Sequence, residues 1–501
     1  MKKIFLSSLL IFSFFNSFSF AQAPRKSQPV AKTTATQTND APFVNKTLAN
    51  GMEIIVLPDP SVPIVTVELA VRNGSFTEPP ELNGLSHLYE HMFFKPNQAS
   101  LLYQCESVLN SGRVLNDLGK RMCATPLGLK NSIGSVSYLD DSDQLSISNG
   151  TTREEVVNYY YTTTSAYAKT AMRQINDAIR YPNFDEEEFQ QEIQVVIGEI
   201  DRNESNPFYY LNQAMTDKLF YKYPTRKNAL GTRATVLSAT TDKMRIIQSR
   251  YYTPDNSALI VTGDVNAEEI FKFAEQTFGS WEKRKTNVFK EFPLVEHPAL
   301  TKSEGVIVEQ PVQNVLIQIG WHGPSIGKDD AATYAADVFS YIISQPDSRF
   351  QRAMVDSGLT VSADLGYYTQ RNVGPIQTTL VTSPEKAKDS VKAFYAELAQ
   401  FDKAEYFTDE ELENAKTILE SRDLFEREKL SDYAHTLGFW WSSTGIEYFR
   451  GYHKNLRAVS REEITRYVKT YMQGKNRIGV ALISSEAQSK AQIKAEDLIG
   501  K

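Results

Sequence analysis

Apolar and polar positions along the chain follow two alternating periods. Short apolar runs of strand type lie at residues 52–57 and 64–71, and a helical pattern follows Asn83. Two more long helical patterns come next, before a strand-type run at 257–262 and a helix start at Asn266. Strands and helices mixed in this order are typical of an α+β domain whose sheet is rich in antiparallel pairs.

The same order recurs in the second part of the chain. Strand-type runs lie at 305–309, 315–320, 365–382 and 477–483, with helical patterns at 331–343 and 384–401. The charged, proline-containing stretch around residues 283–300 suits a linker. The sequence therefore predicts two α+β domains of similar size, at 42–285 and 301–501, with a linker at 286–300. An internal duplication stays open, because no strict repeat is visible.

The first forty residues have the pattern of an export signal. Two lysines precede an apolar run at residues 4–15, and the small residues Ser19 and Ala21 fit a cleavage site. The competing interpretation is a membrane anchor, but the run is shorter than the roughly 20 apolar residues that a span needs. We predict a signal peptide at 1–21 and a flexible leader at 22–41, in a periplasmic or secreted protein with no transmembrane segment in the mature chain.

Charge and cysteine content narrow the class of protein. The chain has 501 residues and a formal net charge of −7, and it has no block rich in Lys and Arg. It therefore lacks the electrostatic footprint of a nucleic-acid binder, and we expect no nucleic-acid partner. The two cysteines, Cys105 and Cys123, can form a disulfide in an oxidising compartment or stay as buried free thiols, and the sequence leaves both open.

Two histidines and a glutamate lie together in the pentapeptide HLYEH at 87–91. On a helix His87 and His91 fall about 40° apart, and Glu90 falls about 60° to the other side of His87. Two neutral imidazoles at this spacing suit one Zn²⁺ ion, and a carboxylate that is not a ligand can take a proton from a metal-activated water. This H-x-x-E-H pattern is the inverted zincin motif. The competing interpretation is a pair of packed or surface histidines.

A catalytic zinc ion usually has three protein ligands, so a third ligand should exist. A long helical pattern at 184–205 carries Glu192 and Glu199, which are two turns apart and therefore share one face. A carboxylate on that face can reach a metal held by the first helix, and we predict Glu199 as the third ligand. The alternative is that both glutamates form solvated helix surface, which is the usual place for this residue type.

The residues around the motif resemble the pitrilysin/insulinase metallopeptidases, above all the mitochondrial-processing-peptidase branch and its bacterial relatives. The resemblance rests on residues 74–75, 78, 83–95, 149–152, 158–160, 192, 199, 229–232, 252–256 and 263–265. It covers most of residues 42–500. It implies a processing-peptidase-like α+β fold with two domains of similar type, each an antiparallel-rich sheet packed with helices.

The resemblance implies a zinc-dependent endopeptidase that hydrolyses peptides or unfolded polypeptide segments. It implies His87, His91 and Glu199 as the zinc ligands and Glu90 as the general base. Glu192 would be a supporting carboxylate among the catalytic residues.

The resemblance also implies a way of binding substrate. Asn149 would contact the substrate backbone, with the substrate adding as an extended strand to a sheet edge. An alternative function is a non-catalytic assembly or binding subunit that retains the peptidase fold. Such chains commonly lose the metal motif, which is intact here.

The chain departs from the family pattern in the spacing of its ligands. Between His91 and Glu199 lie 107 residues, about 30 more than the family usually has. The interval from Asn149 to Glu199 looks normal, so we predict an insertion at about 97–148 within the first domain.

The second departure concerns the later domain, where self-sufficient members carry an Arg and a Tyr that bind substrate and stabilise the reacting carbonyl. The matching positions here are Met354 and Val361, whose apolar side chains cannot stabilise an oxyanion. We expect a second, homologous subunit, in a homodimer or a heterodimer, to supply the Arg/Tyr pair. The alternative is that Arg349, Arg352 or Tyr367 substitutes within the chain.

Overall fold

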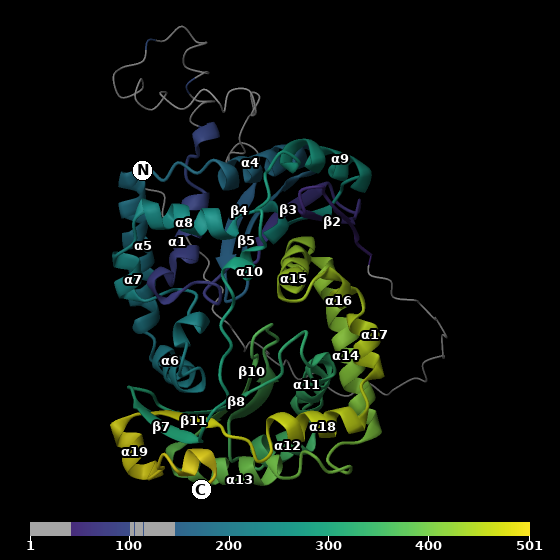
Figure 1. Cartoon of the computed structure of the whole chain (residues 1–501). Helices are drawn as coiled ribbons and strands as arrows, with labels where there is room; N and C mark the ends of the chain where they lie inside the picture. The colour runs from purple at the N-terminus through teal and green to yellow at the C-terminus, as the bar shows by residue number, and fades with distance from the viewer. Residues whose placement is uncertain (1–41, 101–104, 106–113, 115–145) are drawn as a thin grey trace, which may run out of the picture. The chain divides into compact units, whose positions relative to one another are not determined.

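The computed structural model of the chain describes residues 42–100, 105, 114 and 146–501. These residues form two β-sheets with helices packed against them (Figure 1), which confirms the predicted α+β class. The predicted signal peptide and leader, most of the predicted insertion, and Cys123 lie outside the described residues. Within the part of the chain that the structure describes, no helix is long and apolar enough to cross a membrane.

The first sheet has six strands in the order β1-β2-β6-β3-β5-β4. They are β1 (Val44–Thr47), β2 (Glu53–Pro58), β3 (Ile64–Val71), β4 (Ile147–Thr152), β5 (Val157–Thr164) and β6 (Ser257–Gly263). Strands β2 and β6 pair in parallel, and the other pairs are antiparallel. Among the described strands β4 pairs with β5 alone, so β4 is an edge strand of the described sheet, where the resemblance implies that substrate binds.

The second sheet repeats this arrangement in the order β7-β11-β8-β10-β9. Its strands are β7 (Glu304–Glu309), β8 (Val315–His322), β9 (Ser362–Tyr367), β10 (Pro375–Thr382) and β11 (Ile478–Ile483). Only β7 and β11 run in parallel. The strand-type run at 365–382 is in fact part of a hairpin, because a polar loop interrupts it and Val373 there has a φ of 54°.

Helices cover one face of the first sheet and build the larger core. Helices α1 (Leu85–Phe93), α4 (Ala168–Arg180) and α9 (Ala267–Phe278) contact the strands of this sheet, and α5 (Glu186–Glu204) and α8 (Thr241–Tyr251) pack on α1. Alternate residues of the central strand β3, namely Val65, Val67 and Leu69, are buried in this core. The second sheet is covered in the same way by α11 (Asp330–Ser344) and α13 (Ala387–Leu398), with α14 (Asp409–Glu428) and α18 (Arg461–Tyr471) packed on α11.

Each sheet receives a helix from the other half of the chain on its remaining face. Helix α15 (Leu430–Ser443) packs on β3 and β6 of the first sheet (Figure 1). Its Leu437 is buried in one hydrophobic cluster with Ala70 of β3. Helix α6 (Pro207–Leu219) packs on β8 and β11 of the second sheet, where Met215 is buried with Val480. Residues Ala41–Lys501 accordingly form one compact unit, and the predicted domain boundaries stay a prediction.

Shorter helices lie in the connections. They include α7 (Arg233–Leu237), α10 (Val288–Glu291), α12 (Arg349–Gln351), α16 (Ile446–Arg450), α17 (Tyr452–Ala458) and α19 (Ser485–Ala491).

Candidate metal centre

Helix α1 carries the histidine motif, and its N-terminus is fixed by a buried carboxylate. Gly84 precedes the helix with a φ of 87°, a conformation that favours glycine. The Glu78 side chain accepts the backbone N–H groups of Gly84 at 2.8 Å and Ser86 at 2.6 Å. A carboxylate at this end satisfies free N–H groups and matches the helix dipole. Helix α1 is therefore anchored one turn before its first histidine.

One side of α1 enters the core and the other side carries the polar motif. The core side consists of Leu85, Leu88, Tyr89, Met92 and Phe93. His87, Glu90 and His91 lie on the remaining side, where α1 contacts α5 and β4. The 3.6-residue period places the three motif side chains together, as the sequence predicts.

Helix α5 brings two glutamates to the same place. Asp185 caps the helix by accepting the backbone N–H groups of Glu187 and Glu188, both at 3.1 Å. Glu192 is 9% exposed and Glu199 is 5% exposed, on the side of α5 that packs into the core. These two glutamates are therefore not solvated helix surface.

His87, His91 and Glu199 form a cluster that can hold a metal ion, with one potential ligand atom from each residue within 4.8 Å of the others. Glu199 Oε2 lies 3.5 Å from His87 Nε2 and 3.8 Å from His91 Nε2. Atoms bound to one zinc ion at about 2.0–2.2 Å are roughly 3.3–3.6 Å apart in tetrahedral geometry. The 3.5 Å separation lies in this range and the 3.8 Å separation is slightly wider, so a small inward shift of the side chains would complete the ligand geometry.

The electrostatics of the cluster also fit a cation. Glu199 Oε2 is buried and has no hydrogen-bond partner among the described residues. Burial raises the pKa of Glu199 and lowers the pKa of His87 to about 3, so His87 is a neutral imidazole suited to a metal. Burial works against a charged His91, but Glu192, Glu199 and Glu90 raise its pKa overall. A bound cation would offset the cost of burying the Glu199 carboxylate, and a neutral His87 leaves a nitrogen lone pair for it.

Glu192 orients the second histidine. His91 Nδ1 donates to Glu192 Oε2 at 2.9 Å, so a neutral His91 ring would present the lone pair of Nε2 toward Glu199. A carboxylate behind a ligating imidazole fixes the tautomer and the ring orientation. The other oxygen of Glu192, Oε1, lies 2.5 Å from Lys95 Nζ.

Glu90 lies beside the cluster and is held by the edge strand. Thr152 Oγ1 on β4 donates to Glu90 Oε2 at 2.6 Å. Burial raises the pKa of Glu90 to about 7, although the hydrogen bond from Thr152 acts in the opposite direction. A Cβ at Gly150 would lie 2.6 Å from Glu90 Cγ, so this strand position allows α1 to approach closely.

Asn149 lies on the same strand and is exposed. Its Oδ1 accepts the backbone N–H of Gly150 at 2.9 Å. The structure thus brings the four motif and ligand candidates together with Glu192, and it places Asn149 three residues before Thr152, the β4 residue that contacts Glu90.

Sequence reasoning missed two residues of this site, Lys95 and Thr152. Lys95 follows His91 by four residues, one helical turn further on, and Thr152 follows Gly150 by two residues on the strand. These short spacings from known site residues can be read from the sequence. The contacts cannot, because the partners Glu192 and Glu90 belong to other segments of the chain.

The two positions at which the family pattern has Arg and Tyr are apolar and differ in their surroundings. Met354 is fully buried in the core of the second half, and Val361 is 69% exposed. Arg349 Nε lies 3.2 Å from a Glu397 oxygen, and the Tyr367 hydroxyl donates to the Pro324 carbonyl at 3.0 Å. Arg349 and Tyr367 are therefore engaged within the second half, whereas Arg352 is exposed and stays an alternative within the chain.

One cysteine can be described. Cys105 is buried and disulfide-bonded, which excludes the free-thiol alternative for this residue. Cys123 lies outside the described residues.

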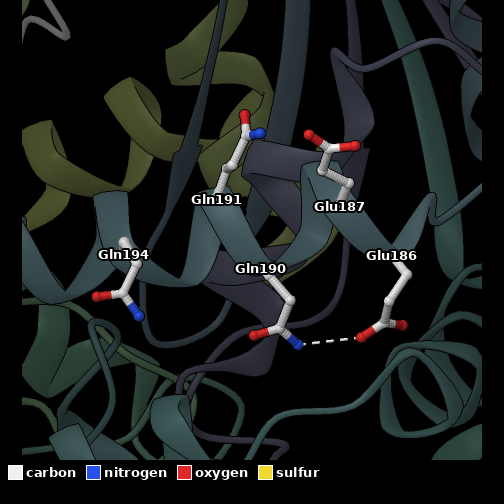
Figure 2. Close-up of a pocket in the computed structure, with 5 residues that line it drawn as sticks. All are labelled: Glu186, Glu187, Gln190, Gln191 and Gln194. Atoms are coloured by element: carbon white, nitrogen blue, oxygen red, sulfur yellow. Dashed lines mark hydrogen bonds between the residues drawn. The ribbon is translucent and has the colours of Figure 1, made fainter.

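A surface pocket lies along α5, apart from the ligand cluster. Figure 2 shows the side chains that line it, namely Glu186, Glu187, Gln190, Gln191 and Gln194. All five residues are exposed, and Gln190 Nε2 donates to Glu186 Oε1 at 3.0 Å. None of the metal-ligand candidates lines this pocket.

Two family models match the chain. The model described as "Insulinase (Peptidase family M16)" matches residues 53–109 and 142–233, and "Peptidase M16 inactive domain" matches residues 238–419. The first match leaves out residues 110–141, which fall inside the interval of the predicted insertion.

Similar curated proteins are named as zinc proteases. The uncharacterized zinc protease YmxG of Bacillus subtilis strain 168 is 24% identical over 372 residues, which is 74% of this chain and 81% of that protein. The zinc protease PqqE of Helicobacter pylori strain 26695 is 21% identical over 433 residues, which is 85% of this chain and 89% of that protein.

Solved structures share the fold. A protease from Helicobacter pylori aligns with a TM-score of 0.71 and 20% identity, over 88% of this chain and 99% of that one. The first half of the periplasmic protease PqqL from Escherichia coli aligns with a TM-score of 0.69 and 15% identity, over 92% and 96%. The whole PqqL chain aligns over 93% of this chain but only 50% of its own length, with a TM-score of 0.67 and 15% identity.

Proposed function

Because the chain belongs to the insulinase family of peptidases, family M16, we propose that it is a zinc-dependent endopeptidase acting on peptides or unfolded polypeptide segments. The observation that carries the proposal is the convergence of His87, His91 and Glu199, with Glu90 beside them. Two imidazoles and one carboxylate are a ligand set of catalytic zinc sites, which keep a further position open.

The roles of the residues follow from their positions. A zinc ion held by His87, His91 and Glu199 would act as a Lewis acid on the carbonyl of the scissile bond and make a nearby water more acidic. Glu90 takes the proton of the attacking water and then delivers it to the leaving amine. Thr152 holds one oxygen of Glu90, which leaves the other oxygen for this proton transfer.

Substrate binding is proposed at β4, an edge strand of the described sheet. An extended peptide can pair there through main-chain hydrogen bonds, with Asn149 contacting its backbone. Such pairing is tolerant of sequence, which suits peptides and unfolded segments as substrates. The Thr152 contact ties this strand to Glu90, so a paired substrate would lie beside the general base.

The variant Glu90→Gln tests the enzymatic role. It removes the proton acceptor and keeps the three ligands, so zinc content should match wild type while cleavage of a mixed peptide pool falls about 10²- to 10⁴-fold. Zinc can be measured by elemental analysis and cleavage by mass spectrometry. Equal cleavage by both proteins would overturn the assignment of Glu90. A wild type that binds zinc but cleaves nothing, even together with the protein that co-isolates with it, would favour the non-catalytic subunit.

We also propose that a second, homologous subunit completes the site. The supporting observations are the apolar residues at positions 354 and 361, the engagement of Arg349 and Tyr367 elsewhere, and the match of this chain to one half of PqqL. The chain should be purified with whatever co-isolates, and peptide cleavage compared with and without that companion. The companion should raise the rate about 10²- to 10³-fold, the usual value of an oxyanion donor. Full activity of the single chain would overturn this proposal.

Export is the third part of the proposal. The lysines and apolar run before residue 21 support it, and a disulfide at Cys105 suits an oxidising compartment. Cell fractionation should find the protein outside the cytoplasm with an N-terminus near Gln22. A cytoplasmic protein that retains Met1 would contradict it.

A further inference from the structure

Lys95 connects the end of the metal-binding helix to the carboxylate that orients His91. It lies just after α1, one turn beyond His91, and its Nζ is 2.5 Å from Glu192 Oε1. The second oxygen of the same carboxylate accepts His91 Nδ1 at 2.9 Å. We propose that Lys95 is a positioning residue for the metal centre, acting through Glu192 on the orientation of His91. This inference rests on the proposed zinc-binding function.

Glu192 needs such a contact because of its surroundings. It is 9% exposed, with Glu188 one turn before it and Glu199 two turns after it on α5. Like charges at these spacings repel one another. The Lys95 ammonium offsets that repulsion and fixes one carboxylate oxygen, so the other oxygen stays aimed at His91. Charge-assisted hydrogen bonds on both sides hold a carboxylate more tightly than one alone.

The consequence for the metal passes through the imidazole ring. If the Glu192 carboxylate turned away, His91 Nδ1 would lose its acceptor and the ring could rotate. His91 Nε2 would then leave the place where it lies 3.8 Å from Glu199 Oε2. Partners behind a ligating histidine typically change metal affinity by about 10- to 100-fold. Lys95 is one contact further out, so the lower end of that range applies.

The direction in which zinc affinity changes when Lys95 is replaced distinguishes a positioning role from a purely electrostatic one. A lysine that acted only as a nearby positive charge would repel a divalent cation, and its removal would tighten zinc binding. A lysine that positions Glu192 is paired with that carboxylate, so its charge is largely compensated toward the metal. Its removal then weakens zinc binding. The Lys95 side chain is 34% exposed, so its replacement leaves no large cavity.

The test is zinc affinity, measured on metal-free full-length protein by competition with a chromophoric chelator. Lys95→Met should bind zinc about tenfold more weakly than wild type, and Lys95→Arg should restore affinity to within about twofold. Lys169→Met is the control for loss of a lysine charge, because Lys169 forms an exposed ion pair with Glu269 at 3.3 Å and contacts none of the three ligand candidates. It should bind zinc like wild type. Thermal unfolding of each metal-free variant reports whether it is folded. If Lys95→Met does not fold, the zinc affinity of Lys95→Gln is measured in its place and decides the test.

A double-mutant cycle tests whether Lys95 acts through Glu192. In the Glu192→Gln background, Lys95→Met should cause no further loss of zinc affinity. Additive losses would overturn the proposed route, and unchanged or tighter binding by Lys95→Met in the wild-type background would overturn the proposal outright. Either result leaves the zinc site itself intact. A wild-type protein that binds no zinc would instead overturn the proposed function and this inference with it.

Discussion

At the scale of single residues, Glu199 is a buried carboxylate of the candidate site with one oxygen, Oε2, that lacks a hydrogen-bond partner among the described residues. Burying a charged oxygen without a partner destabilises the folded protein, and a bound cation reverses that cost. The Glu199 side chain should therefore lower the free energy of unfolding of the metal-free protein and raise that of the zinc-bound protein.

We expect Glu199→Gln to leave the metal-free protein as stable as wild type or more stable, and to abolish its response to zinc. Zinc at about 100 times its dissociation constant should stabilise wild type by about 2.7 kcal/mol. Thermal unfolding with chelator and with added zinc measures both effects. Glu187→Gln, on the exposed face of α5, is the control and should respond to zinc like wild type. An equal zinc response in Glu199→Gln would contradict Glu199 as a ligand.

The candidate site could be predicted only as far as short-range periodicity reaches. The positions of His87, Glu90 and His91 relative to one another follow from one helix, and the shared face of Glu192 and Glu199 follows from another. That the two helices lie together was inferred only from zinc chemistry, because a catalytic zinc ion usually has a third protein ligand. The contacts of Lys95 and Thr152 depend on the packing of α1 against α5 and β4, which no local pattern encodes.

At the scale of elements, two helical glycines have opposite surroundings. Gly438 lies in α15 where the helix crosses β3, and a Cβ there would be 2.7 Å from Glu68 Oε1 and 3.4 Å from Ala70 Cβ. Glu68 is fully buried, so it has little room to move. Gly198 lies on the exposed side of α5, with no atom within 4 Å of an added Cβ. The same substitution should therefore have opposite effects.

Gly438→Ala should lower the free energy of unfolding by about 1–3 kcal/mol, because α15 must move away from the sheet or displace Glu68. Gly198→Ala should raise it by about 0.5–1 kcal/mol, because alanine has the higher helix propensity and nothing obstructs it. Urea unfolding of the metal-free proteins measures both. A stabilising Gly438→Ala would show that α15 does not pack closely on the first sheet.

Element types were more predictable than their partners. Strands such as 64–71 and helix starts such as Asn266 agree with β3 and with the N-cap of α9, because apolar period and capping residues act locally. The two strands within the run at 365–382 were harder to separate from sequence, since β9 and β10 share one apolar pattern across a loop. The sequence did not predict that α6 and α15 each pack on the sheet of the other half, because either helix could bury its apolar side on either sheet.

At the scale of the whole described chain, the strand order of the second sheet matches that of the first sheet without β1, and each sheet has one parallel pair. This matching topology supports the internal duplication that the sequence left open. The reciprocal packing of α6 and α15 makes the stability of each half depend on the other. An ion pair between the halves should therefore affect the unfolding of the entire unit.

Such a pair joins His435 of α15 to the buried Glu68 of β3. Asn158 of β5 also donates to Glu68 at 2.8 Å, and the Tyr160 ring lies 4.5 Å from the His435 ring. Burial acts to lower the pKa of His435, but Glu68 and Asp432 outweigh burial and the opposing charge of Arg153, so the pKa is raised overall.

A raised pKa in the folded state sets the sign of the pH dependence. The pair stabilises the protein fully below the ordinary histidine pKa of about 6.5, and this contribution disappears as the pH rises through the higher folded value. The stability difference between wild type and His435→Gln should therefore be largest near pH 6 and shrink toward pH 9. Urea midpoints across that range measure it. Burial lowers the pKa of His322, so His322→Gln should not show this trend. A difference that grows toward pH 9 for His435→Gln would mean that the neutral imidazole, and not an ion pair with Glu68, holds α15 on the first sheet.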